Sequence, residues 1–181
     1  MNYKLISSEI VMRGKVFDLQ VDQIEYESGN KSIREVAIHP GGAVIVAIKD
    51  DGKIILVKQF RYPFQKFLIE LPAGKLNKDE DPLLCAQREL KEETGFTCGK
   101  INKLGSIFTT PGFCTEVLHI YLAERLKAGD HKREEGELSM QILELSLEEI
   151  EDKIKAGEIA DAKTICGIYY YKNSLNQNNL C

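Results

Sequence analysis

The first 40 residues alternate apolar and polar side chains in the way that is typical of half-buried β-strands. The alternation runs through residues 17–21 and, after a slip of one residue that is compatible with a bulge, through residues 24–26. A turn at residues 28–30 precedes a returning strand over residues 33–38. We therefore expect a small antiparallel sheet, which would be marginally stable alone and needs something to pack on.

Beyond Pro40-Gly41-Gly42, which we take as the one boundary within the chain, the pattern changes to dense apolar runs. Residues 43–48 and 53–57 are largely apolar, and Asp50-Asp51-Gly52 lies between them. This pattern predicts two buried strands joined as a hairpin. Further strands are expected at residues 101–108, 117–123 and 138–145.

Capping residues define a helix over residues 82–94. Asp81 suits the N-cap, Pro82 suits the first helical position, and Gly95 suits the position just beyond the last turn. Apolar residues at spacings of three and four form one stripe along this segment, which predicts a helix with one face on the core.

Two more helices are expected towards the end of the chain. Ser146 and Glu149 have the spacing of a capping box, which predicts a helix that begins there and ends at Gly157. Asp161 can cap a last helix that runs to about Lys172. The polar residues 174–181 are expected to form a frayed tail.

Helices and strands are thus mixed without regular alternation, which favours an α+β (mixed) fold over a doubly wound parallel sheet. The expected organisation is an N-terminal β-sheet region (1–40), a main domain (41–173) and the tail (174–181). With 181 residues, 43% of them apolar, the chain has the size of one globular domain with a small appendage.

The charge balance and the cysteines narrow the function classes. Lys and Arg number 24 against 28 Asp and Glu, a formal net charge of −4. Nucleic-acid binders depend on basic residues to neutralise phosphates, so no nucleic acid partner is expected. No membrane partner is expected either, because no apolar run reaches the ~18 residues that span a bilayer. The 5 cysteines are odd in number and have neither C-x-x-C nor His spacing, which argues against a disulfide framework or a zinc site and predicts reduced thiols in a cytoplasmic protein.

Part of the acidic surplus is concentrated on one predicted helix. Glu92 and Glu93 lie three and four residues beyond Glu89, so the three acids share one helical face. Like charges at this spacing destabilise a helix, and its last turn disfavours negative charge. From these residues alone two interpretations are open: a solvated face balanced by Lys91 and Arg88, or a site for a hard cation such as Mg²⁺.

The segment around these acids resembles the Nudix box, whose pattern is glycine, five residues, glutamate, seven residues, and arginine-glutamate-apolar-any-glutamate-glutamate-any-glycine-apolar. Every fixed position is filled, by Gly74, Glu80, Arg88, Glu89, Leu90, Glu92, Glu93, Gly95 and Phe96. A chance match of this length is rare at ordinary residue frequencies. The resemblance to the Nudix family therefore favours the metal site over the solvated face.

The resemblance implies a Nudix-type α/β/α sandwich that hydrolyses a nucleoside diphosphate linked to another moiety, with Mg²⁺ or Mn²⁺ as cofactor. The cations would offset charge on the attacking and leaving oxygens. Glu89 and Glu93 would be the main metal ligands, and Glu92 would be an additional ligand at the catalytic centre. Arg88 would orient the carboxylates. Supporting roles in the geometry of the loops are implied for Gly74, Glu80 and Gly95.

The flanking residues resemble the ADP-ribose pyrophosphatase branch of this family. Residues 57–63 and 70–74 resemble that branch's approach to the box. Pro111 stands where the branch carries a proline, although by itself it could mark a simple turn. The resemblance implies hydrolysis of ADP-ribose to AMP and ribose 5-phosphate. The alternatives are GDP-mannose or another nucleoside diphosphate sugar as substrate, and a non-catalytic nucleotide-sugar sensor on the same fold.

Further metal and catalytic roles are implied by matching segments. The Ala73 carbonyl would join the metal site. The acidic segment 132–137 would supply Glu135 as the general base that activates water and Glu137 as a metal ligand, with a swap or shift of these two roles left open. The alternative for this segment is an ordinary solvated charged loop.

Substrate contacts are implied for a second set of residues. Phe17 would stack on adenine, although an alternating strand is equally compatible with a core aromatic. Arg61 would bind a phosphate or the terminal ribose, because its fork suits phosphate oxygens. Glu70 would accept hydrogen bonds from the adenine or the ribose, and Pro111 would lie at the substrate. In family members the N-terminal sheet pairs with a partner subunit and Arg34 reaches across to the substrate, so we expect a homodimer.

Overall fold

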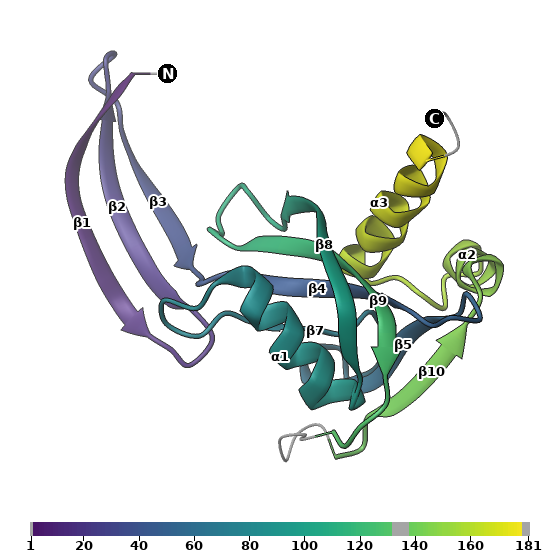
Figure 1. Ribbon diagram of the computed structural model, residues 1–181. Helices are drawn as coiled ribbons and strands as arrows, with labels where there is room; N and C mark the ends of the chain where they lie inside the picture. Colours follow the sequence, from purple (N-terminus) through teal and green to yellow (C-terminus); the bar gives the residue numbers. More distant parts are fainter. Residues whose placement is uncertain (1, 132–137, 179–181) are drawn as a thin grey trace. The chain divides into compact units, whose positions relative to one another are not determined.

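The computed structural model describes residues 2–131 and 138–178, and the chain divides into two compact units (Figure 1). The first unit comprises the chain up to Gly41 together with Phe108–Val117, and the second comprises Gly42–Ile107 together with the chain from Leu118 onward. One division thus falls within the Pro40-Gly41-Gly42 segment. The return of Phe108–Val117 to the first unit has no counterpart in the sequence pattern.

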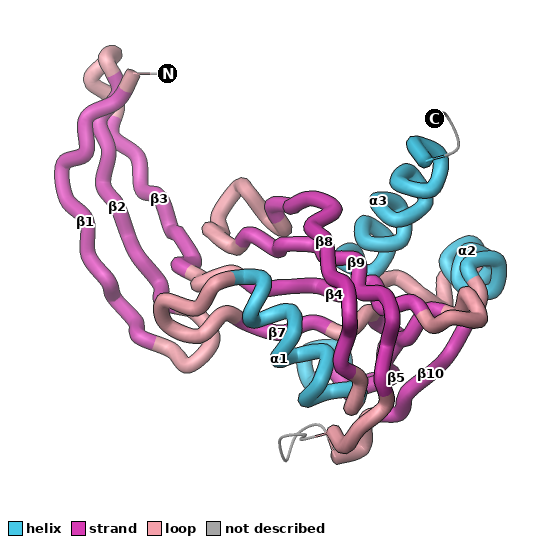
Figure 2. Tube along the Cα trace, viewed as in Figure 1, coloured by secondary structure: helices cyan, strands magenta, loops and turns pink. Residues whose placement is uncertain are grey.

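The first unit contains an antiparallel sheet of 3 strands in the order β1-β2-β3 (Figure 2). Its strands are β1 (Tyr3–Arg13), β2 (Asp18–Tyr26) and β3 (Lys31–Ile38). Strands β2 and β3 are the two that the alternation predicts, whereas β1 is not predicted. The pairing of β2 with β3 is unbroken. The pairing of β2 with β1 shifts register opposite Ile24, where the sequence allows a bulge, and again opposite Gln20, but the extra residue lies on β1 each time.

The second unit is built on a sheet of 7 strands in the order β10-β5-β4-β9-β8, with β6 added to β5 and β7 added to β4. The strands are β4 (Gly42–Ile48), β5 (Ile54–Arg61), β6 (Lys66–Glu70), β7 (Ala73–Lys75), β8 (Thr97–Phe108), β9 (Val117–Lys127) and β10 (Gln141–Leu145). Strands β4 and β5 form the predicted hairpin at residues 47–48 and 54–55. On its other edge, β4 pairs in parallel with β9 over residues 42–47. Strands β6 and β7 are not predicted from the sequence.

Within the part of the chain that the structure describes, three α-helices cover this sheet, and their N-capping residues are those that the sequence indicates. They are α1 (Pro82–Thr94), α2 (Leu147–Lys155) and α3 (Ala162–Asn178), and a short 3₁₀ helix (Tyr62–Phe64) joins β5 to β6. Asp81 accepts a hydrogen bond from the Leu83 N–H at 2.8 Å, and Ser146 and Glu149 form the capping box. The predicted end at Lys172 is wrong, because α3 continues to Asn178 and takes up part of the expected frayed tail.

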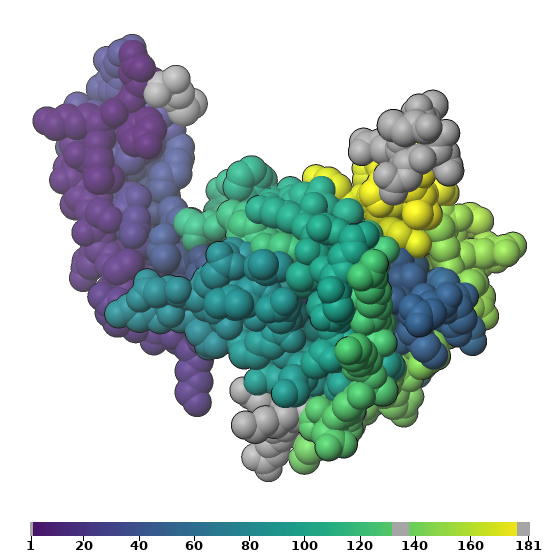
Figure 3. Space-filling model, viewed as in Figure 1, coloured from purple at the N-terminus to yellow at the C-terminus, as the bar shows by residue number. Residues whose placement is uncertain are grey.

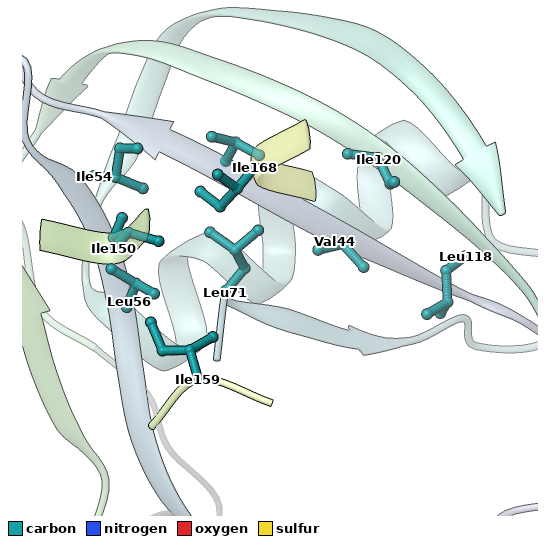
Figure 4. Close-up of a cluster of buried hydrophobic side chains, with 10 residues drawn as sticks. Val44, Ile54, Leu56, Leu71, Leu118, Ile120, Ile150, Ile159 and Ile168 are labelled. Atoms are coloured by element: carbon teal, nitrogen blue, oxygen red, sulfur yellow. The ribbon is translucent and has the colours of Figure 1, made fainter. Parts of the chain in front are cut away.

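Alternate residues of β4 pack on opposite layers. Val44 belongs to the same buried cluster as Ile150 of α2 and Ile168 of α3 (Figure 4). Its neighbour Ile45 packs with Leu90 of α1. The sheet therefore lies between α1 on one face and α2 and α3 on the other, which confirms the mixed α+β class and the α/β/α sandwich. Among the described helices, none is long and apolar enough to cross a membrane.

Candidate active site

Helix α1 buries two of the three acids that the sequence places on one face. Glu89 is 9% exposed and Glu93 is 2% exposed, while the solvent-facing side of the helix carries Leu84, Gln87 and Lys91. The outer side of α1 forms part of the surface of the second unit in the space-filling view (Figure 3). The interpretation of a solvated acidic face is wrong for Glu89 and Glu93, because burial of a carboxylate is costly unless cations or donors face it.

Arg88 is the cation that holds three carboxylates of the box, those of Glu80, Glu89 and Glu92. Its Nη1 donates to Glu89 Oε1 at 2.6 Å and to Glu92 Oε2 at 3.1 Å. Its Nε and Nη2 donate to the two oxygens of Glu80, each at 2.8 Å. Three carboxylates thus share one guanidinium, and this group of four side chains keeps an excess of negative charge. The arrangement orients carboxylate oxygens and leaves a demand for a further cation.

The loop that leads into α1 lies against the buried carboxylates. The Ala73 N–H donates to Glu93 Oε2 at 3.1 Å. A Cβ on Gly74 would lie 1.9 Å from Glu89 Cδ and 2.0 Å from its Oε1, so the Glu89 carboxylate can keep this position only beside a glycine. Strand β7 and helix α1 therefore bring the predicted ligands Ala73, Glu89 and Glu93 into one place.

Cys85 supports the same loop from within the core. Its Sγ donates to the carbonyl oxygens of Gly74 at 3.7 Å and Lys75 at 3.6 Å. Burial, and then the nearby charge of Glu89, raise the pKa of the thiol to about 12, so it stays protonated and keeps its donor. The sequence alone indicates no role for this residue; the structure shows a contact that steadies residues 74–75.

A second buried charged group lies at the end of β5 and β6. Arg61 donates from Nε to Glu70 Oε1 at 2.7 Å and from Nη2 to Glu70 Oε2 at 2.6 Å. Lys163, at the start of α3, donates to the same Oε2. Burial alone would raise the pKa of Glu70, but the hydrogen bond from Arg61 and the charge of Lys163 hold it below its usual value. Glu70 is 1% exposed, which favours a role in holding Arg61 over direct contact with a substrate.

The carboxylates of α1 fit a hard divalent cation. Glu89 and Glu93 are buried oxygen donors, the group around Arg88 carries excess negative charge, and Gly74 leaves room for the Glu89 carboxylate against the backbone. Within residues 2–131 and 138–178, no three His, Cys, Asp or Glu side chains come together in a group that could hold a metal ion. Glu135 and Glu137, which the sequence analysis assigns as base and further ligand, lie outside the described residues.

Comparison with known proteins settles the family. A model described as the NUDIX domain matches residues 38–166, a range that contains the box, the sheet of the second unit and the start of α3. The chain belongs to the Nudix family. Members of this family generally need divalent metal ions, which agrees with the chemistry of the donors around Arg88.

Curated relatives of this Nudix chain carry more than one name. The ADP-ribose pyrophosphatase of Bacillus subtilis (strain 168) is 44% identical over 92% of this chain and 91% of its own length. A methanol dehydrogenase activator of Bacillus methanolicus is 41% identical over 92% of this chain and 91% of its own. The GDP-mannose pyrophosphatase of Escherichia coli (strain K12 / DH10B) is 35% identical over 78% of each chain.

A solved structure supports the Nudix fold over nearly the whole chain. It is described as a crystal structure of an ADP compounds hydrolase and matches with a TM-score of 0.86, covering 98% of this chain and 96% of that one. Sequence identity to it is 19%, so the likeness concerns the fold. The match confirms the mixed sandwich with its additional sheet.

Three predicted substrate contacts belong to the first unit of this Nudix chain. Phe17 is 40% exposed just before β2, so it is not the core aromatic that an alternating strand allows. Arg34 donates to the Tyr26 hydroxyl, to Ser32 Oγ and to the Ile33 carbonyl of its own sheet. Pro111 lies in a turn after β8. The box carboxylates, Arg61 and Glu70 belong to the second unit.

The Arg88–Glu80 pair predicts how stability depends on pH. Hydrogen bonds from Arg88 lower the pKa of Glu80 from 4.5 to about 2. The folded-state pKa is depressed, so the stabilisation is complete above pH 4.5 and is lost as the pH falls towards 2. We expect Glu80→Gln to be less stable than wild type near neutral pH, with a difference that shrinks in acid.

Urea unfolding between pH 7 and pH 3, with a chelator present, measures this difference in the free energy of unfolding. The matched control is Glu148→Gln, an exposed glutamate of α2, for which little change is expected at any pH. A Glu80→Gln defect of constant size across that range would contradict the assignment.

Proposed function

We propose that this Nudix chain hydrolyses the pyrophosphate of ADP-ribose to AMP and ribose 5-phosphate. The observation that carries the proposal is the pair of buried box carboxylates Glu89 and Glu93, of which Glu89 is held by Arg88 and lies where a Cβ on Gly74 would displace it. The 44% identity to an ADP-ribose pyrophosphatase over 92% of the chain supports the choice of substrate. All the carboxylates of the box are present, which argues against a non-catalytic sensor that has lost them.

We infer that Glu89, Glu93 and the Ala73 carbonyl hold Mg²⁺ or Mn²⁺. Such a cation, when bound, offsets negative charge on the attacking and leaving oxygens of a phosphoryl transfer. Arg88 keeps Glu89 and Glu92 oriented through its 2.6 Å and 3.1 Å hydrogen bonds, so that the carboxylates need little rearrangement on binding. Glu135 as the base for the attacking water and Glu137 as a further ligand remain assignments from sequence.

For the substrate, we propose that Arg61 contacts the pyrophosphate. Its side chain is 38% exposed while its partner Glu70 is buried, so the guanidinium is the member of this pair that reaches solvent. Glu70 occupies Nε and Nη2, which leaves Nη1 on the other branch of the fork to meet a phosphate oxygen. The substrate roles of Phe17, Arg34 and Pro111, which belong to the first unit, remain assignments from sequence.

A substrate panel tests this function. ADP-ribose, GDP-mannose, NADH, diadenosine polyphosphates and nucleoside triphosphates are assayed with Mg²⁺ or Mn²⁺. We expect the highest kcat/KM for ADP-ribose, with AMP and ribose 5-phosphate as products. GDP-mannose is the second candidate substrate, because a relative that is 35% identical is a GDP-mannose pyrophosphatase. A higher kcat/KM for GDP-mannose than for ADP-ribose would make it the assigned substrate. No turnover of any compound would favour a sensor.

We also propose that the chain forms a homodimer through its N-terminal sheet and works in the cytoplasm. Among the residues of β1, β2 and β3, Ile24 alone is buried, while Leu5, Val11 and Ile33 are more than half exposed. Such apolar exposure is unusual for a surface without a partner. The four described cysteines are free thiols, which agrees with a reducing compartment. Light scattering at micromolar concentration should give the mass of a dimer, and a monomer would contradict the proposal.

A further inference from the structure

The first turn of α3 carries a buried polar network that the box motif does not include. Lys163 donates to Glu70 Oε2 and lies 3.0 Å from Asp161 Oδ1. Thr164, which is fully buried, donates from its hydroxyl to Asp161 Oδ2 at 2.6 Å and accepts the Leu71 N–H at 2.8 Å. Residues about 90 positions apart in sequence are thus joined at the segment that leads into the box.

Residues 70–73 form the segment that leads into the box, and each of them is held by a contact from another element. Lys163 holds the Glu70 side chain, and Thr164 holds the Leu71 N–H. The Pro72 carbonyl accepts from the Ile45 N–H at 2.9 Å, and the Ala73 N–H donates to Glu93. The position of Glu70 is therefore fixed both by its backbone neighbours and by its side-chain partners.

Among the charged side chains of the network, solvent exposure increases from Glu70 to Lys163 to Arg61. The Glu70 side chain is 1% exposed, that of Lys163 is 14% exposed, and that of Arg61 is 38% exposed. Arg61 is the group that can meet a ligand, and Lys163 lies behind the carboxylate that holds it. Because Lys163 and Arg61 share Oε2 of Glu70, a change at Lys163 alters how tightly and at what angle Glu70 holds Arg61.

We propose that Lys163 is a positioning residue that acts through Glu70 to set Arg61 for the pyrophosphate of the substrate. With Lys163 in place, Glu70 divides its charge between two cations, and Arg61 keeps attraction for an incoming anion. Without Lys163, the buried carboxylate is left to Arg61 alone, and the guanidinium is drawn into an ion pair that competes with phosphate oxygens. This inference rests on the proposed function.

The competing explanation is that Lys163 only stabilises the fold, as many buried ion pairs do. A structural role alone lowers the fraction of active protein, so it reduces kcat and leaves KM unchanged. A positioning role for a pyrophosphate contact weakens binding, so it raises KM more than it lowers kcat. The split between KM and kcat therefore separates the two explanations.

The experiment compares Lys163→Met with Lys163→Arg and with a control on the same helix. The control is Lys172→Met, which removes an ion pair to Glu151 at a site that is half exposed. For Lys163→Met we expect KM for ADP-ribose to rise by about tenfold with kcat within about twofold of wild type. Lys163→Arg should recover most of this loss because it keeps a cation, and Lys172→Met should match wild type.

Direct binding gives a readout that does not depend on turnover. Calorimetric titration with the non-hydrolysable α,β-methylene analogue of ADP-ribose should show an affinity about tenfold lower for Lys163→Met. Should Lys163→Met fail to fold, Lys163→Gln keeps a hydrogen-bond donor for Glu70 without the charge, and the same rise in KM is expected. Unchanged KM and unchanged analogue affinity in a folded variant would overturn the inference. Absence of turnover and of analogue binding in wild type would instead overturn the proposed function.

Discussion

Replacing Glu93 by Gln is expected to lower kcat/KM for metal-dependent hydrolysis by at least about 100-fold. Glu93 is 2% exposed and accepts the Ala73 N–H at 3.1 Å through Oε2. Glutamine has nearly the same volume and can accept that hydrogen bond through its amide oxygen, so the loop and the fold should persist. The charge that attracts a divalent cation is lost, and changes to groups that only support metal ligands already cost about 10- to 100-fold.

Two measurements locate the defect of Glu93→Gln. Activity is followed across Mg²⁺ or Mn²⁺ concentration, and cation affinity is measured by calorimetry without substrate. We expect weaker cation binding, and thermal unfolding without metal close to that of wild type. Glu148→Gln, the exposed glutamate on α2, serves as the control and should keep full activity. If Glu93→Gln kept the wild-type rate at the same cation concentration, Glu93 would not be a metal ligand.

The helix that carries these acids could be predicted from sequence because all its determinants are local. Asp81, Pro82 and Gly95 specify where it begins and ends, and the three-four spacing of its apolar residues gives its core face. The face that carries the acids follows from the same spacing. Burial of Glu89 and Glu93 could not be predicted in this way, because it depends on β7, a three-residue strand around a glycine with no alternation to read.

Strand β1 could not be predicted from the sequence, for a different reason. Its pairing with β2 shifts register twice, once past Leu5 and once past Ile10, and each shift places two successive residues opposite one. The period-two pattern is therefore interrupted within 11 residues. Most of its side chains are also exposed, so burial selects no apolar face that a pattern could reveal.

The network of Lys163, Asp161 and Thr164 shows which residues near the site cannot be predicted from sequence. In sequence, Asp161 is a helix cap and Lys163 is an ordinary charge in a first turn. The contacts of Lys163 with Glu70 and of Thr164 with Leu71 each join positions 93 residues apart, and such long-range pairs leave no signal in a single sequence. The short pattern Glu70-Leu71-Pro72-Ala73-Gly74 indicates that this segment matters, without indicating what holds it in place.

The substitution Gly74→Ala should strongly lower activity through displacement of Glu89 and leave the fold largely intact. An added Cβ would lie 1.9–2.3 Å from the carboxyl atoms of Glu89, so the carboxylate must move. It is held at 2.6 Å by Arg88 and is 9% exposed, so movement breaks that hydrogen bond and removes a proposed cation ligand. We expect kcat/KM to fall by about 100-fold or more, with the larger part of the defect in cation affinity.

A double-mutant cycle with Glu89→Ala tests whether Gly74→Ala acts through this carboxylate. Each single substitution should cause a large loss, and the double variant should be no worse than Glu89→Ala alone, because both remove the same ligand. The loss from Gly74→Ala must then nearly vanish in the Glu89→Ala background. Additive losses would mean that alanine at position 74 acts instead through the backbone of β7, for example through the close approach of its carbonyl to Gly42. The cycle therefore decides whether the box glycine serves the carboxylate or the strand.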